Sequence, residues 1–517
     1  WSRRMSSSRR DRLRRALDGP SALVLCAAAV FPFVGFAARN RAQTFSMARL
    51  AVYAAVVLVV VLAVQVVLVV AVRRLEPRRT AVAWAAVVTS FFLYSAWLPA
   101  LPANDNLVRA NLAIWAIVTA LVTRLVYALA QHRLFRQWCT WTLVLLCAMS
   151  LVSIVLVRPG DDPVASVDPG LADVSPDDLV RQPDVYFFLL DGYARNDQIQ
   201  QLLGYDNSAL HEDLAARGFA VTDASIASYP MTFLSMMSIF ESGYPYDEPA
   251  EFAAVPAGRI DRYIQGDNST MRRFEALGYT TVYAHGGPFA FTRCSGEHVD
   301  VCLEPDSGHG AVGDLELTLE EMTPLGPLDL LQAPRTTPTS VLGALDAADV
   351  ASPRFVFAHI ISPHEPYYFD DSCAARDRPL QQSQVDDAGN RAAYVNEIRC
   401  LNDDLMVALD RLLAADPDAV VIVASDHGSH FATPWQSGLG EWTDAQLLER
   451  FANQNALRLP EACRGDVQPD TPVVHDFAIV FACLEGRAPD LAPVRAMLWR
   501  PTAPETVEEV PLERLGR

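Results

Sequence analysis

Polar side chains that could bind a metal follow three apolar, strand-forming runs of the chain. Asp191 follows "VYFFLL", His364 follows "FVFAHIISP", and the pair Asp426 and His427 follows "VVIVAS". Parallel strands of one sheet end at the same edge, which is where the sites of such sheets usually form. Carboxylate oxygen and imidazole nitrogen atoms suit a divalent metal. The three endings together therefore predict a metal site at one edge of a sheet.

The adjacency of Asp426 and His427 sets a geometric condition on that site. Neighbouring residues within a regular strand point to opposite faces of the sheet. The two side chains can share one metal only where the strand breaks, and Gly428 permits such a break. We therefore expect the chain to turn at this point.

The segment "ASYPMTFLSMMS", residues 227–238, supplies candidate nucleophiles. Among its hydroxyl groups, Thr232 lies where a loop is expected to become a helix. Free backbone N–H groups and the helix dipole favour an anion there. A hydroxyl held by a metal at that place would be an activated nucleophile. The alternative is that Thr232 only caps the helix.

The residues from 184 onward alternate between strand and helix patterns, as a scaffold for these groups requires. Strands are expected at 184–192, 219–224, 279–287, 354–362, 419–425 and 473–484. Helices are expected at 208–217, from 232, and at 271–277, 392–415 and 442–451, the last with a capping box formed by Thr443 and Gln446. This order predicts an α/β/α sandwich, in which helices cover both faces of an open, mostly parallel sheet.

The N-terminal part of the chain has a different composition. Five long apolar runs cover about 21–38, 50–72, 80–100, 110–130 and 137–157, and each approaches the roughly 20 residues that a membrane-spanning helix needs. If the N-terminus is cytoplasmic, the inside segments hold 13 Arg and the outside loops 4. This bias predicts a cytoplasmic N-terminus, and five spans then place the rest of the chain outside the cytoplasm.

The domain organisation follows from these patterns. We expect a polytopic five-helix transmembrane domain at 1–157, a linker rich in acidic residues, Pro and Gly at 158–183, a domain carrying the candidate site at 184–490, and a tail at 491–517.

The net charge of −19 hides a contrast between the two parts. The first 157 residues hold 18 of the 42 basic and 4 of the 61 acidic residues, so the remainder has a net charge of −33. Such a domain repels the phosphate backbone of nucleic acid, which excludes nucleic acid as an expected partner. A bound cation could still make a local anion site within it.

The exported part holds six of the nine Cys residues, an even number that fits an oxidising compartment. We predict disulfides between sequence neighbours, namely 294–302, 373–400 and 463–483. The alternative is a set of scattered buried thiols.

At this point the residues resemble the alkaline phosphatase/sulfatase superfamily. The resemblance is greatest to its membrane-anchored, sulfatase-like branch, which includes the lipoteichoic acid synthase-type phosphoglycerol transferases. It covers about 184–485 and rests on "DVYFFLLDGYAR", "SYPMTFLSMMS", "FAHIISPHEPYYFD" and "VIVASDHGSH", in the family's order. It implies an alkaline phosphatase-like fold and a multi-pass protein of the bacterial plasma membrane.

Carried over by position, the resemblance implies a set of roles. The metal ligands would be Asp191, Thr232, Asp426 and His427, with Thr232 also the nucleophile. His364 would steady the phosphoryl group or protonate the leaving group. One divalent metal is implied, for which we expect Mn2+, with Mg2+, Zn2+ or Ca2+ as alternatives. The implied activity moves a phospho-head group from a membrane lipid donor to an envelope glycan or lipid acceptor.

Other polar residues near these motifs are weaker candidates. Arg195 and His285 could contact an anionic head group, and His430 could contact substrate or only solvent. His359 lies within a strand, so we expect it to be structural.

Two departures from the family pattern matter. Sulfatases commonly carry paired Asp after the first strand, whereas here Gly192 follows Asp191. In "SYPMT", Thr232 occupies the position at which a formylglycine sulfatase needs Arg. These differences favour a Thr nucleophile and phosphate chemistry. A sulfatase or phosphodiesterase of the same superfamily remains the alternative activity, and an inactive membrane scaffold is the alternative outside enzymes.

Overall fold

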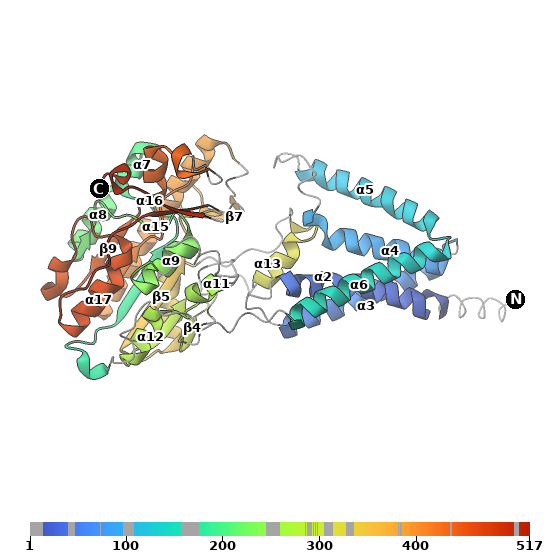
Figure 1. The fold of residues 1–517 in the computed structure, drawn as a ribbon, viewed down its shortest axis with the longest axis horizontal. Coiled ribbons are helices and arrows are strands. Elements are labelled where there is room, and N and C mark those ends of the chain that lie inside the picture. The colour runs from blue at the N-terminus through green and yellow to red at the C-terminus, as the bar shows by residue number, and fades with distance from the viewer. Residues whose placement is uncertain are drawn as a thin grey trace. The chain divides into compact units, whose positions relative to one another are not determined.

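The computed structural model of the chain contains two compact units (Figure 1). One comprises Trp1–Asp161 with Val312–Gln332, and is called the helical unit below; the other comprises Asp162–Ala311 with Ala333–Arg517, and is called the sheet unit. The residues that the structure describes are 14–39, 47–72, 74–96, 108–156, 175–244, 259–284, 286, 292, 294, 296, 298–303, 314–326, 336–380, 382, 385–434, 437–500 and 506–517.

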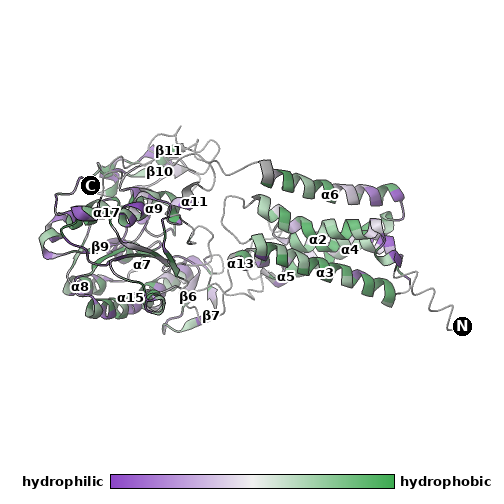
Figure 2. Cartoon of the chain, turned by 90° about the horizontal axis from the view of Figure 1, so that it is seen from below, coloured by the Kyte–Doolittle hydropathy of each residue, from purple (hydrophilic) through white to green (hydrophobic). Residues whose placement is uncertain are grey.

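The helical unit is built from long apolar helices, which Figure 2 shows as mainly hydrophobic along their length. They are α2 (Gly19–Arg39), α3 (Met47–Ala71), α4 (Pro77–Phe92), α5 (Val108–Leu129) and α6 (Arg133–Leu156). Among the described residues, four of them, α2, α3, α5 and α6, are long and apolar enough to cross a membrane. The fifth span, expected over 80–100, stays a prediction, because α4 has 16 residues and 97–107 lie outside the described part.

A short helix from later in the sequence packs within the same unit. The helix α13 (Asp314–Glu321) joins an apolar cluster of Phe33, Phe36, Ala37, Leu50, Leu315 and Met322. The Tyr53 hydroxyl donates a hydrogen bond to the Glu316 carboxylate, which also lies 4.0 Å from the Arg49 guanidinium. The helix α13 therefore lies at the end of the unit where α2 ends and α3 begins.

The sheet unit is organised around seven strands in the order β2-β9-β8-β1-β5-β3-β4. Their bounds are β1 (Val185–Leu190), β2 (Phe219–Val221), β3 (Thr280–Ala284), β4 (Val301–Leu303), β5 (Arg354–Ile360), β8 (Val420–Ala424) and β9 (Asn455–Arg458). The central strand β1 is parallel to β5 and β8, and β3 is parallel to β4 and β5. The strand β9 is antiparallel to both of its neighbours, β2 and β8, so the sheet is mixed.

Helices cover both faces of this sheet. Alternate residues of β1 face opposite ways, with Phe188 in one apolar cluster and Phe187 in the other. The first cluster includes α7 (Asn196–Leu203), α8 (Ser208–Ala216), α14 (Pro338–Ala348) and α15 (Asp387–Ala415). The second includes α9 (Thr232–Glu241), α11 (Arg259–Ile264), α12 (Ser269–Ala276) and α17 (Asp476–Glu485). The unit is thus a three-layer α/β/α sandwich.

One predicted strand is wrong, because residues 473–484 contain most of the helix α17. An apolar run that is buried on all sides carries no periodicity to separate strand from helix. The sequence does contain residues typical of helix ends. Asp476 occupies the first turn of α17, and Gly486 follows its last residue with φ +69°. The strand β9 was missed because it has only four residues. The capping box of Thr443 and Gln446 is confirmed at α16 (Asp444–Phe451).

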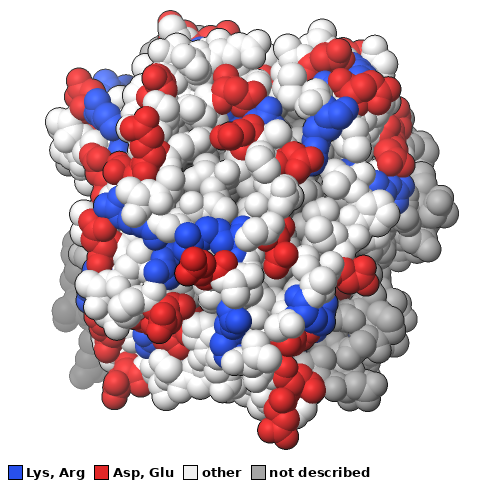
Figure 3. All heavy atoms as spheres, turned by 90° about the vertical axis from the view of Figure 1, so that its left-hand side faces the viewer, with Lys and Arg blue, Asp and Glu red and all other residues white. Residues whose placement is uncertain are grey.

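The remaining strands form two hairpins, β6 (Tyr367–Phe369) with β7 (Ala375–Leu380) and β10 (Met497–Arg500) with β11 (Thr506–Glu509). The three predicted disulfides, 294–302, 373–400 and 463–483, are all present. On one face of the sheet unit, acidic side chains are spread widely, as the net charge of this part leads one to expect, and Arg side chains lie among them (Figure 3).

Candidate metal and nucleophile site

The ends of β1 and β8 place two carboxylates side by side. Leu189 is in register with Ala424 across these parallel strands, so the residues that follow, Asp191 and Asp426, leave the sheet at the same edge. Ligand atoms of Asp191, Asp426 and His427 all lie within 4.8 Å of one another. The three side chains are buried. The sheet topology thus brings together three of the residues that the sequence pattern singled out.

Each carboxylate has one oxygen held by the protein and one that faces His427. His359 Nε2 lies 3.0 Å from Asp191 Oδ2, and the Gly192 N–H donates to Asp426 Oδ1 at 3.1 Å. Asp191 Oδ1 and Asp426 Oδ2 are buried and have no hydrogen-bond partner among the described residues. They lie 3.7 Å and 3.2 Å, respectively, from His427 Nε2.

The ring of His427 presents an unprotonated nitrogen to these oxygens. His427 Nδ1 lies 2.9 Å from the Gly428 carbonyl, which can only accept, so Nδ1 carries the proton. Burial and the nearby Arg450 guanidinium keep the pKa of His427 well below its usual value, so the ring is neutral. Its bare Nε2 therefore faces two carboxylate oxygens with no proton between them.

Thr232 also lies against His427. It is the first residue of α9, and its Oγ1 lies 3.1 Å from His427 Nε2. Met231 is the N-cap residue, so the hydroxyl of Thr232 does not cap this helix. Ser235, one turn along α9, donates a hydrogen bond to the Asp426 carbonyl at 2.5 Å and fastens the helix to the strand end.

The electrostatics of the cluster match the requirements of a cation. Burial and the charge of Asp191 raise the pKa of Asp426 to about 6. Burial alone would raise the pKa of Asp191, but the hydrogen bond from His359 and the nearby imidazoles hold it below the usual range. Two carboxylates, a bare imidazole nitrogen and a hydroxyl form a donor set that suits a divalent metal. The residues present therefore fit the metal that the resemblance implies.

Two glycines allow the close packing of these groups. Gly192 has φ +69°, and a Cβ there would meet the His427 and His364 rings at about 3.5–3.6 Å. Gly428 was expected to free a turn, but its φ is not positive. Its role is a close approach, because a Cβ would lie 2.2 Å from the Glu449 carbonyl oxygen. A larger residue at Gly428 would push α16 away from the strand end.

The other predicted site residues fall into different places. The ring of His364 lies with its centroid 6.4 Å from that of His427 and stacks on His430 at 5.2 Å. Gly192, His364 and His430 line a small recess beside the cluster. Arg195 is buried and bonds Asp197 and the Ser225 carbonyl, so its substrate role stays a prediction. His285 lies outside the described residues.

Two residues of this site were not recognised from the sequence. His359 was expected to be structural, yet it contacts Asp191 through its ring. Arg450 of α16 is buried, and its guanidinium donates hydrogen bonds to the carbonyls of Pro230 and Gly428. It thereby joins the loop before Thr232 to the loop after His427. Side chains alternate between the two faces of β5, and this alternation gives a weak indication of where the side chain of His359 lies. The sequence of α16 gives no such indication for Arg450.

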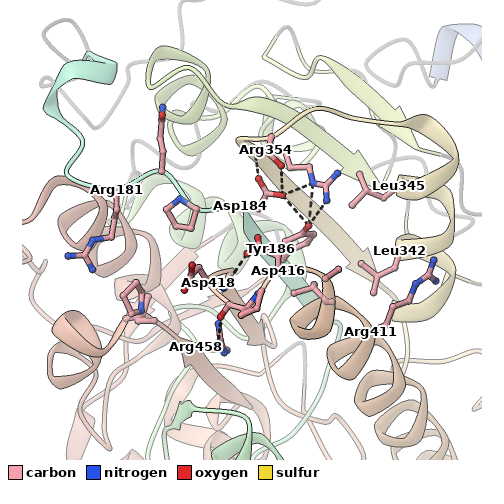
Figure 4. A pocket seen from close by; sticks show the side chains of 18 of the residues that line it. Arg181, Asp184, Tyr186, Leu342, Leu345, Arg354, Arg411, Asp416, Asp418 and Arg458 are labelled. Carbon is pink, nitrogen blue, oxygen red and sulfur yellow. Dashed lines mark hydrogen bonds and ion pairs between the residues drawn. The ribbon is translucent and has the colours of Figure 1, made fainter.

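A separate cavity of about 900 Å³ lies near the opposite ends of the strands, where β1 and β5 begin (Figure 4). Part of its charge is paired within the protein. Arg354 bonds Asp184 and Tyr186, and Arg458 donates to the carbonyls of Pro417 and Ala419. This cavity shares no residue with the cluster around His427, and we assign it no part in the chemistry.

Fold and site together define an α/β/α domain with a buried carboxylate, imidazole and hydroxyl cluster at the carboxyl edge of its sheet. The family model described as Sulfatase matches residues 187–456, slightly more than half of the chain. The chain belongs to the sulfatase family. No curated protein matches the sequence.

Solved structures with a related shape include the following. The C-terminal periplasmic domain of EcEptC from Escherichia coli is 14% identical, with a TM-score of 0.40 over 64% of this chain and 93% of that one. The integral membrane lipooligosaccharide phosphoethanolamine transferase A from Neisseria meningitidis is 13% identical, with a TM-score of 0.39 over 90% of this chain and 95% of that one. The phosphonate monoester hydrolase of Agrobacterium radiobacter is 14% identical, with a TM-score of 0.36 over 62% and 80%.

Proposed function

We propose that this protein is a metal-dependent phosphotransferase or phosphohydrolase in which Thr232 is the nucleophile. The observation that carries the proposal is the contact of the Thr232 hydroxyl, at the start of α9, with the bare imidazole nitrogen of His427, which also faces two buried carboxylate oxygens. Asp191, Asp426, His427 and Thr232 would hold the metal. A divalent cation bound there would lower the pKa of the hydroxyl and offset charge on the phosphoryl group.

The chain's own groups would carry the reaction. Thr232 Oγ1 forms a bond to phosphorus and gives its proton to water, while the bond from phosphorus to the leaving oxygen breaks. The free N–H groups at the start of α9 stabilise charge on the phosphoryl oxygens. His364, in its protonated form, gives the leaving oxygen a proton. A hydroxyl of the acceptor, or water, then attacks the phosphorus and gives its proton to His364. The bond from phosphorus to Oγ1 breaks, and Oγ1 takes up a proton from water, which releases Thr232.

Phosphate chemistry is favoured over sulfate by the position of Thr232. A formylglycine sulfatase needs Arg at this place of its motif, whereas Thr232 points its hydroxyl at His427. The donor set of two carboxylates, one imidazole and one hydroxyl suits Mn2+, our first choice, and also Mg2+, Zn2+ or Ca2+.

We further propose a multi-pass location in a bacterial plasma membrane, with the sheet unit outside the cytoplasm. The three disulfides and the Arg-rich N-terminal segment support this orientation. A membrane-held enzyme suits a lipid donor of the phospho-head group and a glycan or lipid acceptor of the envelope. Arg195, His285 and His430 remain our candidates for substrate contact.

The proposal is tested by trapping the intermediate. Full-length protein with Mn2+ is mixed with a nitrophenyl phosphodiester, quenched with acid, and digested for mass spectrometry. We expect a phosphoryl adduct on the peptide that holds Thr232, and its loss in Thr232→Ala. A wild-type protein that cleaves a sulfate ester but not the phosphodiester would support the sulfatase alternative. Activity that survives Thr232→Ala would contradict the proposed nucleophile.

A further inference from the structure

A cavity of about 550 Å³ opens between three helices of the helical unit, at the end where α2, α4 and α6 begin. Its lining combines basic, polar and apolar side chains. Arg78 of α4 and Arg133 and Arg136 of α6 contribute charge, and Leu23, Val24, Val82 and Trp141 contribute apolar surface. All three helices begin at this end of the unit, so their first turns lie around the opening of the cavity.

Only part of the positive charge that lines the cavity is paired or hydrogen-bonded within the protein. Arg78 Nε pairs with Asp18 at 2.6 Å, and Arg136 Nη1 donates to the Ala130 and Gln131 carbonyls. Arg133 is exposed and forms no ion pair or hydrogen bond with any described residue. The cavity therefore keeps an excess of cationic donors.

A buried hydroxyl gives a second and independent indication of a ligand. Ser21, in the first turn of α2, lines the cavity and is 2% exposed. Its Oγ is buried and makes no hydrogen bond of good geometry in the described part of the chain, although it lies near the Asp18 carboxylate. A buried hydroxyl without a partner costs free energy, so a polar group that enters the cavity would relieve this cost.

The apolar part of the lining reaches the outer surface of the helices. Leu23 is 41% exposed and Trp141 is 61% exposed, although both are large and hydrophobic. In helices long enough to cross a membrane, such side chains face lipid, and Trp is enriched at the level of the head groups. A molecule that occupies the cavity would therefore meet cationic donors inside and acyl chains outside.

We propose that this cavity binds the phosphate of an anionic phospholipid. Basic pockets between membrane helices on the cytoplasmic side are suited to such head groups. The phosphate would accept from Arg133, Arg136 and Ser21, and the acyl chains would lie along Leu23 and Trp141. The site lies where α6 begins, whereas the sequence of the sheet unit follows the other end of α6. None of the residues that line it belongs to the sheet unit, so it shares no residue with the site of the proposed reaction.

The test uses full-length protein in a neutral detergent and native mass spectrometry. Phosphatidylglycerol is the anionic probe and phosphatidylcholine the zwitterionic one. We expect selective retention of phosphatidylglycerol, and a loss of affinity of roughly 25-fold in the double variant Arg133→Gln, Arg136→Gln, at about fivefold for each charge near the surface. Ser21→Ala should also weaken retention without lowering the thermal midpoint of the lipid-free protein.

Arg74→Gln is the matched control, because Arg74 lies near the start of α4 but outside the cavity lining. The proposal is overturned if the double variant retains phosphatidylglycerol as the wild type does, or if Arg74→Gln weakens retention equally. It is also overturned if inorganic phosphate alone raises the thermal midpoint as much as phosphatidylglycerol does, since the site would then recognise free anions. None of these outcomes depends on the proposed chemistry at Thr232.

Discussion

His359 Nε2 lies 3.0 Å from Asp191 Oδ2, and this contact joins β5 to the end of β1 inside the sheet unit. Both side chains are buried. A carboxylate is an acceptor, so His359 must carry its proton on Nε2. The hydrogen bond fixes the rotation of the carboxylate and leaves Oδ1 directed at His427. We therefore expect His359 to act on the candidate metal through Asp191, as a positioning residue.

Replacement of His359 is expected to weaken metal binding without removing a ligand. In His359→Leu, Asp191 loses its partner and can rotate, so affinity for Mn2+ should fall about 10- to 100-fold, as is usual for residues behind a ligand. His359→Gln keeps a donor and should recover part of the loss. Calorimetric titration of the full-length protein measures this, with His298→Gln as the control. Equal affinities of His359→Leu and wild type would refute the positioning role.

Metal removal is expected to destabilise the protein through the paired carboxylates. Burial and Asp191 raise the pKa of Asp426 to about 6, so at pH 7 the metal-free cluster holds two buried negative charges. Metal at 100 times its Kd should stabilise the fold by about 2.7 kcal/mol. Asp426→Asn should raise the melting temperature of the metal-free protein yet remove the response to metal. Melting curves with and without a chelator check both effects, and a variant that still responds to Mn2+ would contradict the ligand assignment.

Arg450 is expected to affect turnover more than metal affinity. Its guanidinium bonds the carbonyls of Pro230 and Gly428, so it sets the distance between the loop that carries Thr232 and the loop that follows His427. Arg450→Lys keeps the charge but cannot hold both carbonyls in a fixed fork. We expect kcat to fall about 100-fold, because misplacement of about 1 Å is enough, while the Kd for Mn2+ changes little. Arg487→Lys, at an exposed position just after α17, is the control.

The sequence was informative about the site where the polar residues follow long apolar strands. Asp191, Asp426 and His427 were predicted correctly as neighbours because parallel strands must end at one edge. Arg450 could not be predicted, because it reaches the site from α16 through two backbone carbonyls that no side-chain pattern encodes. The segment 473–484 was assigned to a strand because continuous burial removes the periodicity that distinguishes α17.

The pH dependence of stability should report the buried carboxyl of Asp476. Burial holds its pKa well above the usual value. Asn455 Nδ2 donates to Asp476 Oδ1 at 3.0 Å, and Oδ2 has no hydrogen-bond partner among the described residues. A carboxyl with a raised folded-state pKa keeps its proton on folding. The contribution of Asp476 to stability is therefore fully present below about pH 4 and is lost as pH rises through its folded-state pKa. Asp476→Asn should remove this decline.

Melting temperatures from pH 4 to pH 8 measure that difference. At pH 8 we expect the free energy of unfolding of Asp476→Asn to exceed that of the wild type by about 1–3 kcal/mol. At pH 4 the two proteins should differ little. Asp470→Asn is the opposite control, because hydrogen bonding to Arg517 lowers the pKa of that exposed carboxyl. Above pH 4, Asp470→Asn should therefore be less stable than the wild type. Parallel curves for wild type and Asp476→Asn would show that Asp476 is ionised in the folded protein.

The disulfide between Cys463 and Cys483 should be a main support of the late helix α17. It joins the segment after β9 to the last turn of α17 across a sequence separation of 20. A cross-link that closes a loop of this length restricts the unfolded chain and stabilises the fold by about 3 kcal/mol. The double variant Cys463→Ala, Cys483→Ala should therefore melt at a lower temperature, whereas Cys139→Ala, at a free thiol in α6, should not. Peptide mapping of protein isolated without reductant gives the direct check, because free thiols at Cys463 and Cys483 would contradict both the disulfide and the proposed location outside the cytoplasm.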